Sequence, residues 1–141
     1  MTDIKPARDR KGEGGQVEEC LFCTEAYRSR AIARQGTVFA VPDGFPVTPG
    51  HLLIIPLRHT ADFFSMTPEE RDDLEELLIL MKDRILEGDP AVTGFNIGVN
   101  CGVSAGQSIM HAHVHLIPRR DGDTANPKGG VRGVIPGKRG Y

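Results

Sequence analysis

Nine residues near the C-terminal end, Met110-His111-Ala112-His113-Val114-His115-Leu116-Ile117-Pro118, carry most of the information about this chain. Side chains of a β-strand alternate between its two faces with a period of two. A strand over residues 109–117 would therefore place His111, His113 and His115 on one face, with neighbouring imidazoles roughly 6.5 Å apart. The residues between them are small or apolar and predict a face packed on the core. We therefore expect the imidazole face to line a cleft.

Three histidines in strict alternation indicate a functional site. One histidine in a strand is commonly a satisfied polar group, but packing does not explain three of them. His-x-His is a common chelating pair for a metal ion. Neighbouring imidazoles also supply a nucleophile and a proton donor for catalysis. The residues alone leave both kinds of chemistry open.

A second cluster, Cys20-Leu21-Phe22-Cys23, has the spacing of half a zinc site or of a redox pair. A redox pair normally follows a strand and opens a helix, whereas this one follows a polar leader, so zinc is favoured. Histidines are the residues in useful places for the two remaining ligands. Two thiolates and two imidazoles make a closed, structural site with no open position for water. The third cysteine, Cys101, is interpreted as a small packing residue.

The segment between residues 102 and 108 is a candidate phosphate cradle. Its small residues let backbone N–H groups approach an anion, and Gln107 and Ser108 add side-chain donors. It is not a P-loop, because it lacks the GK[ST] ending. The weight of this prediction comes from the three histidines that follow it.

A long amphipathic helix is predicted over residues 68–87. Thr67 is a good N-cap, Pro68 suits the first helical position and Glu70 completes a capping box. The apolar stripe has helical spacing and consists of Leu74, Leu77, Leu78, Met81 and Ile85. Gly88 and Pro90 end the helix.

Strands are predicted on both sides of this helix. Residues 31–35 and 37–41 flank Gly36 as a hairpin, and residues 51–55 form a strand that Pro56 ends. Residues 94–99 and 109–117 supply two more. This order predicts an α+β fold, an antiparallel sheet of about five strands with one long helix packed on it.

The 141 residues predict one folded domain, residues 18–118. Residues 1–17 are expected to be a flexible polar leader, and residues 119–141 a basic Gly/Pro-rich extension that packs on the domain or on a dimer partner. The absence of a long apolar run and of a secretory h-region predicts no membrane partner and a cytoplasmic location. The net charge of −2 argues against a dedicated nucleic-acid partner.

The histidine stretch resembles the signature of the histidine triad (HIT) superfamily of nucleotide hydrolases and transferases. Further blocks match in the same order between Cys20 and Pro118. They are Cys20-x-x-Cys23, Asp43-x-x-Pro46, Gly50-His51-x-Leu53-x-Ile55-Pro56-x-x-His59, Asn96, Asn100 and Gly106-Gln107-Ser108. The tail over residues 129–136 looks like a bacterial branch of the superfamily.

The resemblance implies a homodimer that attacks the α-phosphate of a purine nucleotide through a covalent nucleotidyl-histidine intermediate. By position, His113 would be the nucleophile, His115 would contact the phosphate or the leaving-group atom, and His51 would orient the triad. A structural zinc ion would be held by Cys20, Cys23, His59 and His111. Asp43 would hold the ribose hydroxyls, and phosphate oxygens would be held by Asn100, Gln107 and Ser108.

Two features refine the expected activity. In the uridylyltransferase branch, the resemblance implies Gln at the position of His115, so the histidine here favours hydrolysis over transfer. The CxxC favours a zinc-bearing nucleotide hydrolase. The expected substrate is a dinucleoside polyphosphate or a nucleoside phosphoramidate, with a nucleoside monophosphate as product. One alternative is a nucleotide-binding or interaction module with little catalysis. Another is a hydrolase with His111, His113 and His115 on one catalytic metal.

Overall fold

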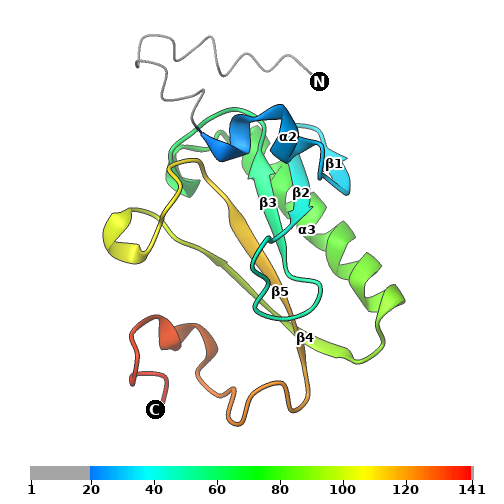
Figure 1. Cartoon of the computed structure of the whole chain (residues 1–141), viewed down its shortest axis with the longest axis vertical. Helices are drawn as coiled ribbons and strands as arrows, with labels where there is room; N and C mark the ends of the chain where they lie inside the picture. Colours follow the sequence, from blue (N-terminus) through cyan, green and yellow to red (C-terminus); the bar gives the residue numbers. More distant parts are fainter. Residues whose placement is uncertain (1–19, 141) are drawn as a thin grey trace.

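The computed structural model describes residues 20–140, and the predicted leader, residues 1–17, lies outside them. A five-stranded sheet and one long helix make up the fold (Figure 1). The strands are β1 (Ala33–Gln35), β2 (Val38–Pro42), β3 (Leu52–Pro56), β4 (Val92–Val99) and β5 (Val114–Arg120). The helical segments are η3 (Leu21–Cys23), α2 (Glu25–Arg28), η4 (Phe63–Ser65), α3 (Pro68–Gly88), η5 (Val103–Ala105) and η6 (Gly130–Val134).

The sheet has the strand order β1-β2-β3-β5-β4, and every neighbouring pair is antiparallel. This confirms the predicted α+β architecture and the predicted hairpin of β1 and β2. The last strand along the chain, β5, lies between β3 and β4, so both of its edges are paired. The histidine stretch therefore enters the sheet at an interior position, where its side chains are held by neighbours on both sides.

The boundaries of α3 follow the local signals in the sequence. The Thr67 side chain accepts a hydrogen bond from the Glu70 backbone N–H, and the Glu70 carboxylate accepts one from the Thr67 backbone N–H. This reciprocal capping box satisfies two N–H groups that the helix itself leaves unpaired. At the other end, the Asp89 N–H donates to the carbonyl of Ile85 and closes the last turn.

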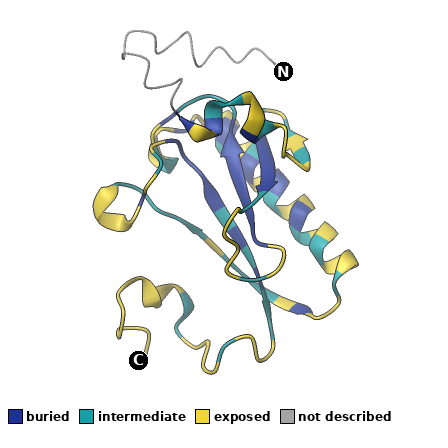
Figure 2. Cartoon of the chain, viewed as in Figure 1, coloured by how far each residue is buried: buried dark blue, intermediate teal, exposed yellow. Residues whose placement is uncertain are grey.

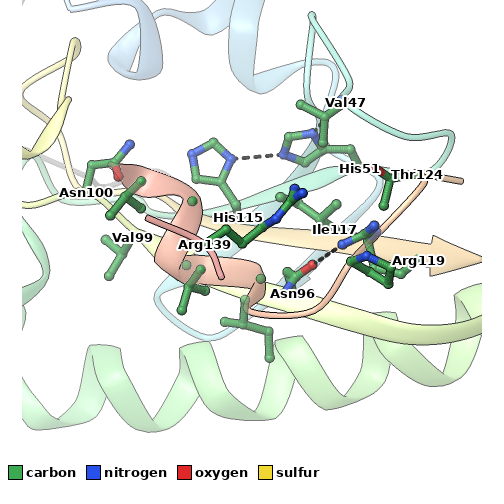
Figure 3. Close-up of a pocket in the computed structure, with 17 residues that line it drawn as sticks. Val47, His51, Asn96, Val99, Asn100, His115, Ile117, Arg119, Thr124 and Arg139 are labelled. Atoms are coloured by element: carbon green, nitrogen blue, oxygen red, sulfur yellow. Dashed lines mark hydrogen bonds between the residues drawn. The ribbon is translucent and has the colours of Figure 1, made fainter. Parts of the chain in front are cut away.

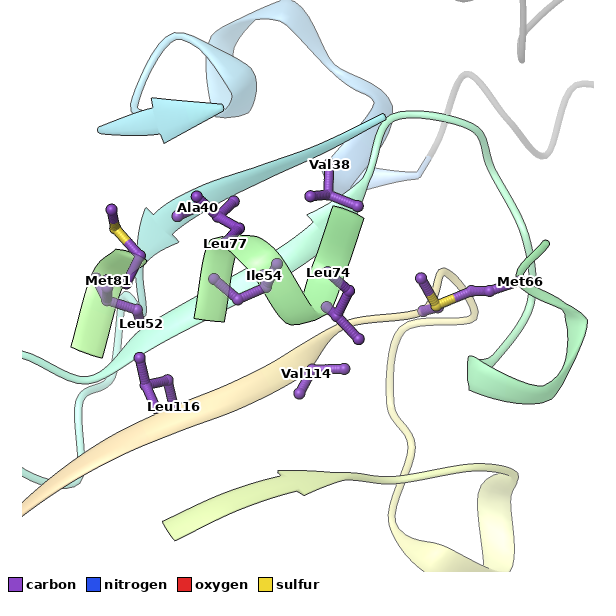
Figure 4. Packing of buried hydrophobic residues seen from close by; sticks show 11 residues of the cluster. Val38, Ala40, Leu52, Ile54, Met66, Leu74, Leu77, Met81, Val114 and Leu116 are labelled. Carbon is purple, nitrogen blue, oxygen red and sulfur yellow. The ribbon is translucent and has the colours of Figure 1, made fainter. Parts of the chain in front are cut away.

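Both faces of the central strands are covered, which is why β2 and β3 consist almost wholly of apolar residues. Alternate residues such as Ile54 face α3 (Figure 4), and those between, such as Leu53, face the segment η3–α2. Figure 2 shows the strands buried between these two covers. The core beneath α3 contains Val38, Ala40, Leu52, Ile54, Met66, Leu74, Leu77, Met81, Ala112, Val114 and Leu116.

The predicted strand over residues 109–117 is wrong at both ends, because β5 runs from Val114 to Arg120. Before it, the Ala112 N–H donates to the carbonyl of Thr60, in a loop rather than in a neighbouring strand. The alternation nevertheless extends through this irregular part, since Ala112, Val114 and Leu116 all pack in the core under α3. The strand predicted over residues 94–99 begins earlier, at Val92, with an irregular register at its start.

The C-terminal extension leaves β5 at Arg120 and turns back so that η6 lies against β4. The turn is held by an ion pair between Arg119 and Asp123, which are 2.7 Å apart. The same guanidinium donates a hydrogen bond to the side-chain oxygen of Asn96 on β4, at 2.7 Å. The extension is thereby tied to the outer strand of the sheet.

Candidate active site and metal centre

Four predicted metal ligands come together where η3, the loop after β3 and the segment before β5 meet. They are Cys20, Cys23, His59 and His111, and their ligand atoms all lie within 4.8 Å of one another. Three sulfur–nitrogen pairs, Cys20–His111, Cys23–His59 and Cys23–His111, are 3.4–3.6 Å apart, and the two Nδ1 atoms are 3.2 Å apart. This cluster could hold a metal ion.

Hydrogen bonds around the cluster favour the unprotonated, metal-binding forms of His111 and Cys20. The Nε2–H of His111 donates to the carbonyl of Pro56 at 2.8 Å, which leaves Nδ1 unprotonated and directed at the cysteines. The pKa of Cys20 lies well below that of an ordinary thiol, chiefly because Cys23 hydrogen-bonds to its thiolate. A hydrogen bond with His111 acts in the same direction, while burial opposes it.

His113 presents one ring nitrogen to its own backbone and the other to a groove. Its Nδ1 lies 2.9 Å from the carbonyl oxygen of His111, and because a carbonyl only accepts, Nδ1 carries the proton. Within residues 20–140, no group hydrogen-bonds to Nε2, whose lone pair is free. The ring is 9% exposed and packs edge-on against Phe22, but it lines a groove of about 480 Å³ together with Asp43.

His51 and His115 form a hydrogen-bonded pair, and the backbone N–H of Val47 determines which nitrogen of each ring carries the proton. The N–H of Val47 donates to Nδ1 of His51 at 3.1 Å, so the proton of a neutral His51 is on Nε2. That Nε2 is 2.9 Å from Nδ1 of His115 (Figure 3) and 3.3 Å from a carboxylate oxygen of Asp43. The shorter contact makes Nδ1 of His115 an acceptor. His115 therefore carries its own proton on Nε2.

Burial favours the uncharged form of the three imidazoles. It lowers the pKa of His51, with Asp43 opposing the shift. The pKa of His113 is also lowered by burial, although its hydrogen bond to the His111 carbonyl opposes this. The pKa of His115 is lowered by burial and further by repulsion from His113 and His51. Neutral rings are what the hydrogen-bond pattern requires, and a neutral imidazole is the nucleophilic form.

The loop between β4 and β5 places one predicted phosphate contact differently from expectation. Gln107 is 4% exposed, and its amide donates to the carbonyls of Ala61 and Ile109. Its oxygen accepts from the Gly102 N–H at 2.8 Å. The side chain thus braces the loop instead of facing a groove. Ser108, by contrast, lines the His113 groove.

Two grooves meet at the histidines. The first is the one of about 480 Å³, with Phe22, Tyr27 and Phe45 in its wall. The second, of about 840 Å³, lies between β4 and the C-terminal extension (Figure 3). Asn100 and His115 line both grooves, so they stand where a ligand would pass from one to the other.

The sequence analysis missed several residues of these grooves. Tyr27 and Phe45 carry no motif, and only their proximity in the fold reveals them. Arg139, in the C-terminal extension, lines the larger groove. The basic composition of the tail was a signal, but it does not tell which cation faces inward.

The alternative of a single catalytic metal on His111, His113 and His115 does not match the grouping of ligand atoms. Among the described residues, His111 belongs to the cysteine cluster, and His115 to a second group with Asp43 and His51. His113 belongs to neither.

Among residues 20–140, no helix is both long and apolar enough to span a bilayer.

Curated relatives share sequence with the region that carries these sites. A Mycobacterium tuberculosis protein named AP-4-A phosphorylase is 37% identical over 94 residues, covering 65% of this chain and 47% of its own. The asymmetrical bis(5'-nucleosyl)-tetraphosphatase of Schizosaccharomyces pombe is 38% identical over 78 residues, covering 55% and 42%. The chain thus spans about half the length of these relatives.

Solved structures have the same fold. A Zn-bound histidine triad family protein from Mycobacterium smegmatis superposes with a TM-score of 0.69 at 30% identity, over 78% of this chain and 81% of its own. A HIT family protein from Bacillus anthracis gives a TM-score of 0.68 at 32% identity, over 75% and 77%. The family model for the HIT domain matches residues 25–122, which include all three triad histidines. The chain therefore belongs to the HIT domain family.

Proposed function

We propose that this protein is a nucleotidyl hydrolase that cleaves nucleotide conjugates at the α-phosphate through a covalent intermediate on His113. The observation that carries the proposal is the free Nε2 lone pair of a neutral His113 beside a groove that Asp43 and Ser108 also line. An imidazole fixed in this tautomer is ready to attack phosphorus without a base. The two relatives named for dinucleoside tetraphosphate substrates support the substrate class.

In the first step, Nε2 of His113 forms a bond to the α-phosphorus while the bond from phosphorus to the leaving atom breaks. Nε2–H of His115 donates a hydrogen bond to that atom, which takes up a proton from solvent when the leaving group is basic. In the second step, a water molecule attacks phosphorus, the N–P bond breaks with its electron pair returning to Nε2 of His113, and the water's proton is released to solvent. The products are a nucleoside monophosphate and the leaving group, and each imidazole ends as it began.

The smaller groove suits the nucleoside half of the substrate. Phe22, Tyr27 and Phe45 offer aromatic surface for a purine base, and Asp43 offers carboxylate oxygens to ribose hydroxyls. Asn100 and Ser108 are placed for phosphate oxygens where the grooves meet. Gln107 supports this arrangement indirectly, by holding the loop that carries Ser108.

We propose that the metal of the cysteine cluster is zinc in a structural role. Tetrahedral zinc, with Zn–S about 2.3 Å and Zn–N about 2.0–2.1 Å, separates sulfur from nitrogen by about 3.5 Å and two nitrogens by about 3.3 Å. The observed separations of 3.4–3.6 Å and 3.2 Å fit this geometry. Because all four ligands would come from the protein, the ion would have no open position for substrate. It would instead connect η3 to the histidine segment. Metal-binding thiols suit a reducing compartment such as the cytoplasm.

We also propose that the protein is a homodimer. Within the described fold, β4 is an eight-residue edge strand, and it bears Ile97 at 54% exposure. An unpaired edge with exposed apolar side chains favours pairing with another strand. Sedimentation analysis tests this: Ile97→Lys should shift the protein from dimer to monomer, and a wild-type monomer at micromolar concentration would contradict it.

The test of the proposed activity is the fate of the α-phosphate. Acid-free quenching during turnover of diadenosine tetraphosphate should leave an adenylyl group on His113, detected by peptide mass spectrometry. His113→Ala should lose both the adduct and turnover, with nucleotide binding retained. Wild-type turnover by His113→Ala would end the proposal. Tight binding without saturable turnover in the wild type would instead favour a binding module.

The 37% identity to a protein named AP-4-A phosphorylase favours a second candidate, in which phosphate replaces water in the second step. The two differ in product. Diadenosine tetraphosphate with added inorganic phosphate yields adenosine diphosphate if phosphate is the acceptor, and adenosine monophosphate if water is. We expect the monophosphate in both the presence and the absence of phosphate.

A further inference from the structure

The ionisable side chains that line the larger groove are all basic. Its ionisable lining residues are His51, His115, Arg119 and Arg139, and none of the carboxylates of residues 20–140 lines it. Asp123, at 2.7 Å, compensates Arg119 from outside the groove. Within residues 20–140, no hydrogen bond or ion pair holds the guanidinium of Arg139. Of the two arginines that line the groove, Arg139 is therefore the one without an acidic partner among the described residues.

The extension that carries Arg139 adds to this bias. Between residues 124 and 140 it contains Lys128, Arg132, Lys138 and Arg139 and no acidic residue. An exclusively positive segment along one wall of a groove raises the local concentration of anions. Figure 3 shows the Arg139 side chain reaching across the groove from the extension, on the side where His115 lies.

The position of Arg139 is built into the fold of the extension. Gly129 adopts φ 92°, and a Cβ there would overlap the carbonyl oxygen of Arg139. A Cβ on Gly133 would lie 3.7 Å from the Arg139 side chain. The glycines before and within η6 thus leave the space through which the returning chain passes. Glycine at residue 129 is required twice, for the backbone angle and for the close approach.

We propose that Arg139 is a specificity-determining residue that binds the leaving group and selects anionic polyphosphate over uncharged leaving groups. The inference rests on the proposed hydrolase function and deepens it. With the nucleoside in the smaller groove and the α-phosphate at His113 and His115, the leaving group occupies the larger groove. A guanidinium there offers paired N–H donors to phosphate oxygens, whose negative charge grows as the bond to the α-phosphorus breaks.

The test compares two substrates that share an adenosine α-phosphate: diadenosine tetraphosphate and an adenosine phosphoramidate of an uncharged amine. Arg139→Gln should lower the ratio of their kcat/KM values about tenfold, because a charge-assisted hydrogen bond is lost only with the polyphosphate. Lys138→Gln removes the same charge one residue away and does not line the groove. That control should leave the ratio within about twofold, because Lys138 is exposed and lies outside the groove.

Two further measurements separate position from net charge and from the hydrolase proposal. Gly129→Ala should displace Arg139 and lower the ratio as Arg139→Gln does, although the charge is unchanged. Binding of inorganic tripolyphosphate, followed by calorimetry, should weaken about tenfold in Arg139→Gln and needs no turnover. An unchanged ratio with unchanged tripolyphosphate binding overturns the role of Arg139, while the hydrolase stands or falls on His113→Ala.

Discussion

Replacing His51 by leucine tests the hydrogen bond that Nε2–H of His115 donates to the leaving group. In the native site, the Val47 N–H fixes Nδ1 of His51 as an acceptor, and Nε2–H then donates to Nδ1 of His115 at 2.9 Å. Without that donor, Nδ1 of His115 is free to take the proton and turn toward the Asp43 carboxylate, now 3.8 Å away. Its Nε2 then has no proton to give.

The magnitude follows from the hydrogen bond that decides the tautomer. A bond to a charged group stabilises by about 1.5–3 kcal/mol, so the competent tautomer should become about 10–150 times rarer. His51→Leu should therefore lower kcat by that factor on a phosphoramidate, whose amine must be protonated to leave. An adenosine 4-nitrophenyl phosphate, whose leaving group departs as an anion, should lose less than about threefold.

His51→Gln is the matched control, since a Gln amide can donate to Nδ1 of His115 from the position of the imidazole N–H. It should retain most activity on both substrates. Steady-state kinetics on the two leaving groups, with thermal unfolding to verify that each variant folds, completes the assay. Equal losses on both substrates, or a glutamine variant as impaired as the leucine one, would refute the assignment of tautomers.

Three further predictions concern stability. Cys23→Ser should reduce bound zinc from one ion per chain and lower the melting temperature, measured by metal analysis and circular dichroism; an unchanged melting temperature would contradict a structural metal. Glu70→Ala, which removes the carboxylate 2.9 Å from Arg58 and half of the capping box, should cost about 2–4 kcal/mol in urea unfolding, and a loss below about 1 kcal/mol would oppose this. The lowered pKa values of His51 and His115 mean that the unfolded chain binds more protons near pH 6.5. The free energy of unfolding should therefore fall as pH drops below about 6.5, by at most about 1.4 kcal/mol per pH unit for each histidine, and a flat profile between pH 7.5 and 5.5 would contradict this.

Local chemistry explains which parts of the fold the sequence could predict. The start of α3 depends on a capping box formed by Thr67 and Glu70, which are three residues apart, so a short stretch of sequence is enough to predict it. The alternation of buried Ala112, Val114 and Leu116 was predictable for the same reason. Where β5 begins was not, because the Ala112 N–H pairs with Thr60, a loop residue some fifty positions away whose placement no local pattern encodes.

The candidate site shows the same division between local and distant determinants. The chemistry of the donors predicted two cysteines and two histidines, and the resemblance to the histidine triad superfamily identified the histidines as His59 and His111. Gln107 was assigned to phosphate because its residue type suits an anion, yet its three hydrogen bonds go to backbone groups, one of them Ala61. Arg139 was not singled out, because only the return of the extension along β4 decides which of its cations faces the groove.

His111 connects the metal cluster to the proposed nucleophile, His113, through its side chain and its backbone. Its imidazole lies among the cysteines, while its carbonyl accepts the Nδ1–H of His113 and thereby leaves Nε2 as the reactive atom. A displacement of the His111 backbone would move this acceptor, and the proton of His113 would be free to shift to Nε2, which removes the nucleophilic lone pair. A metal that takes no part in the chemistry can thus still govern the rate, because it fixes the carbonyl that selects the tautomer. His111 and His113 are two residues apart, and this spacing brings the His111 carbonyl within hydrogen-bonding distance of the His113 ring.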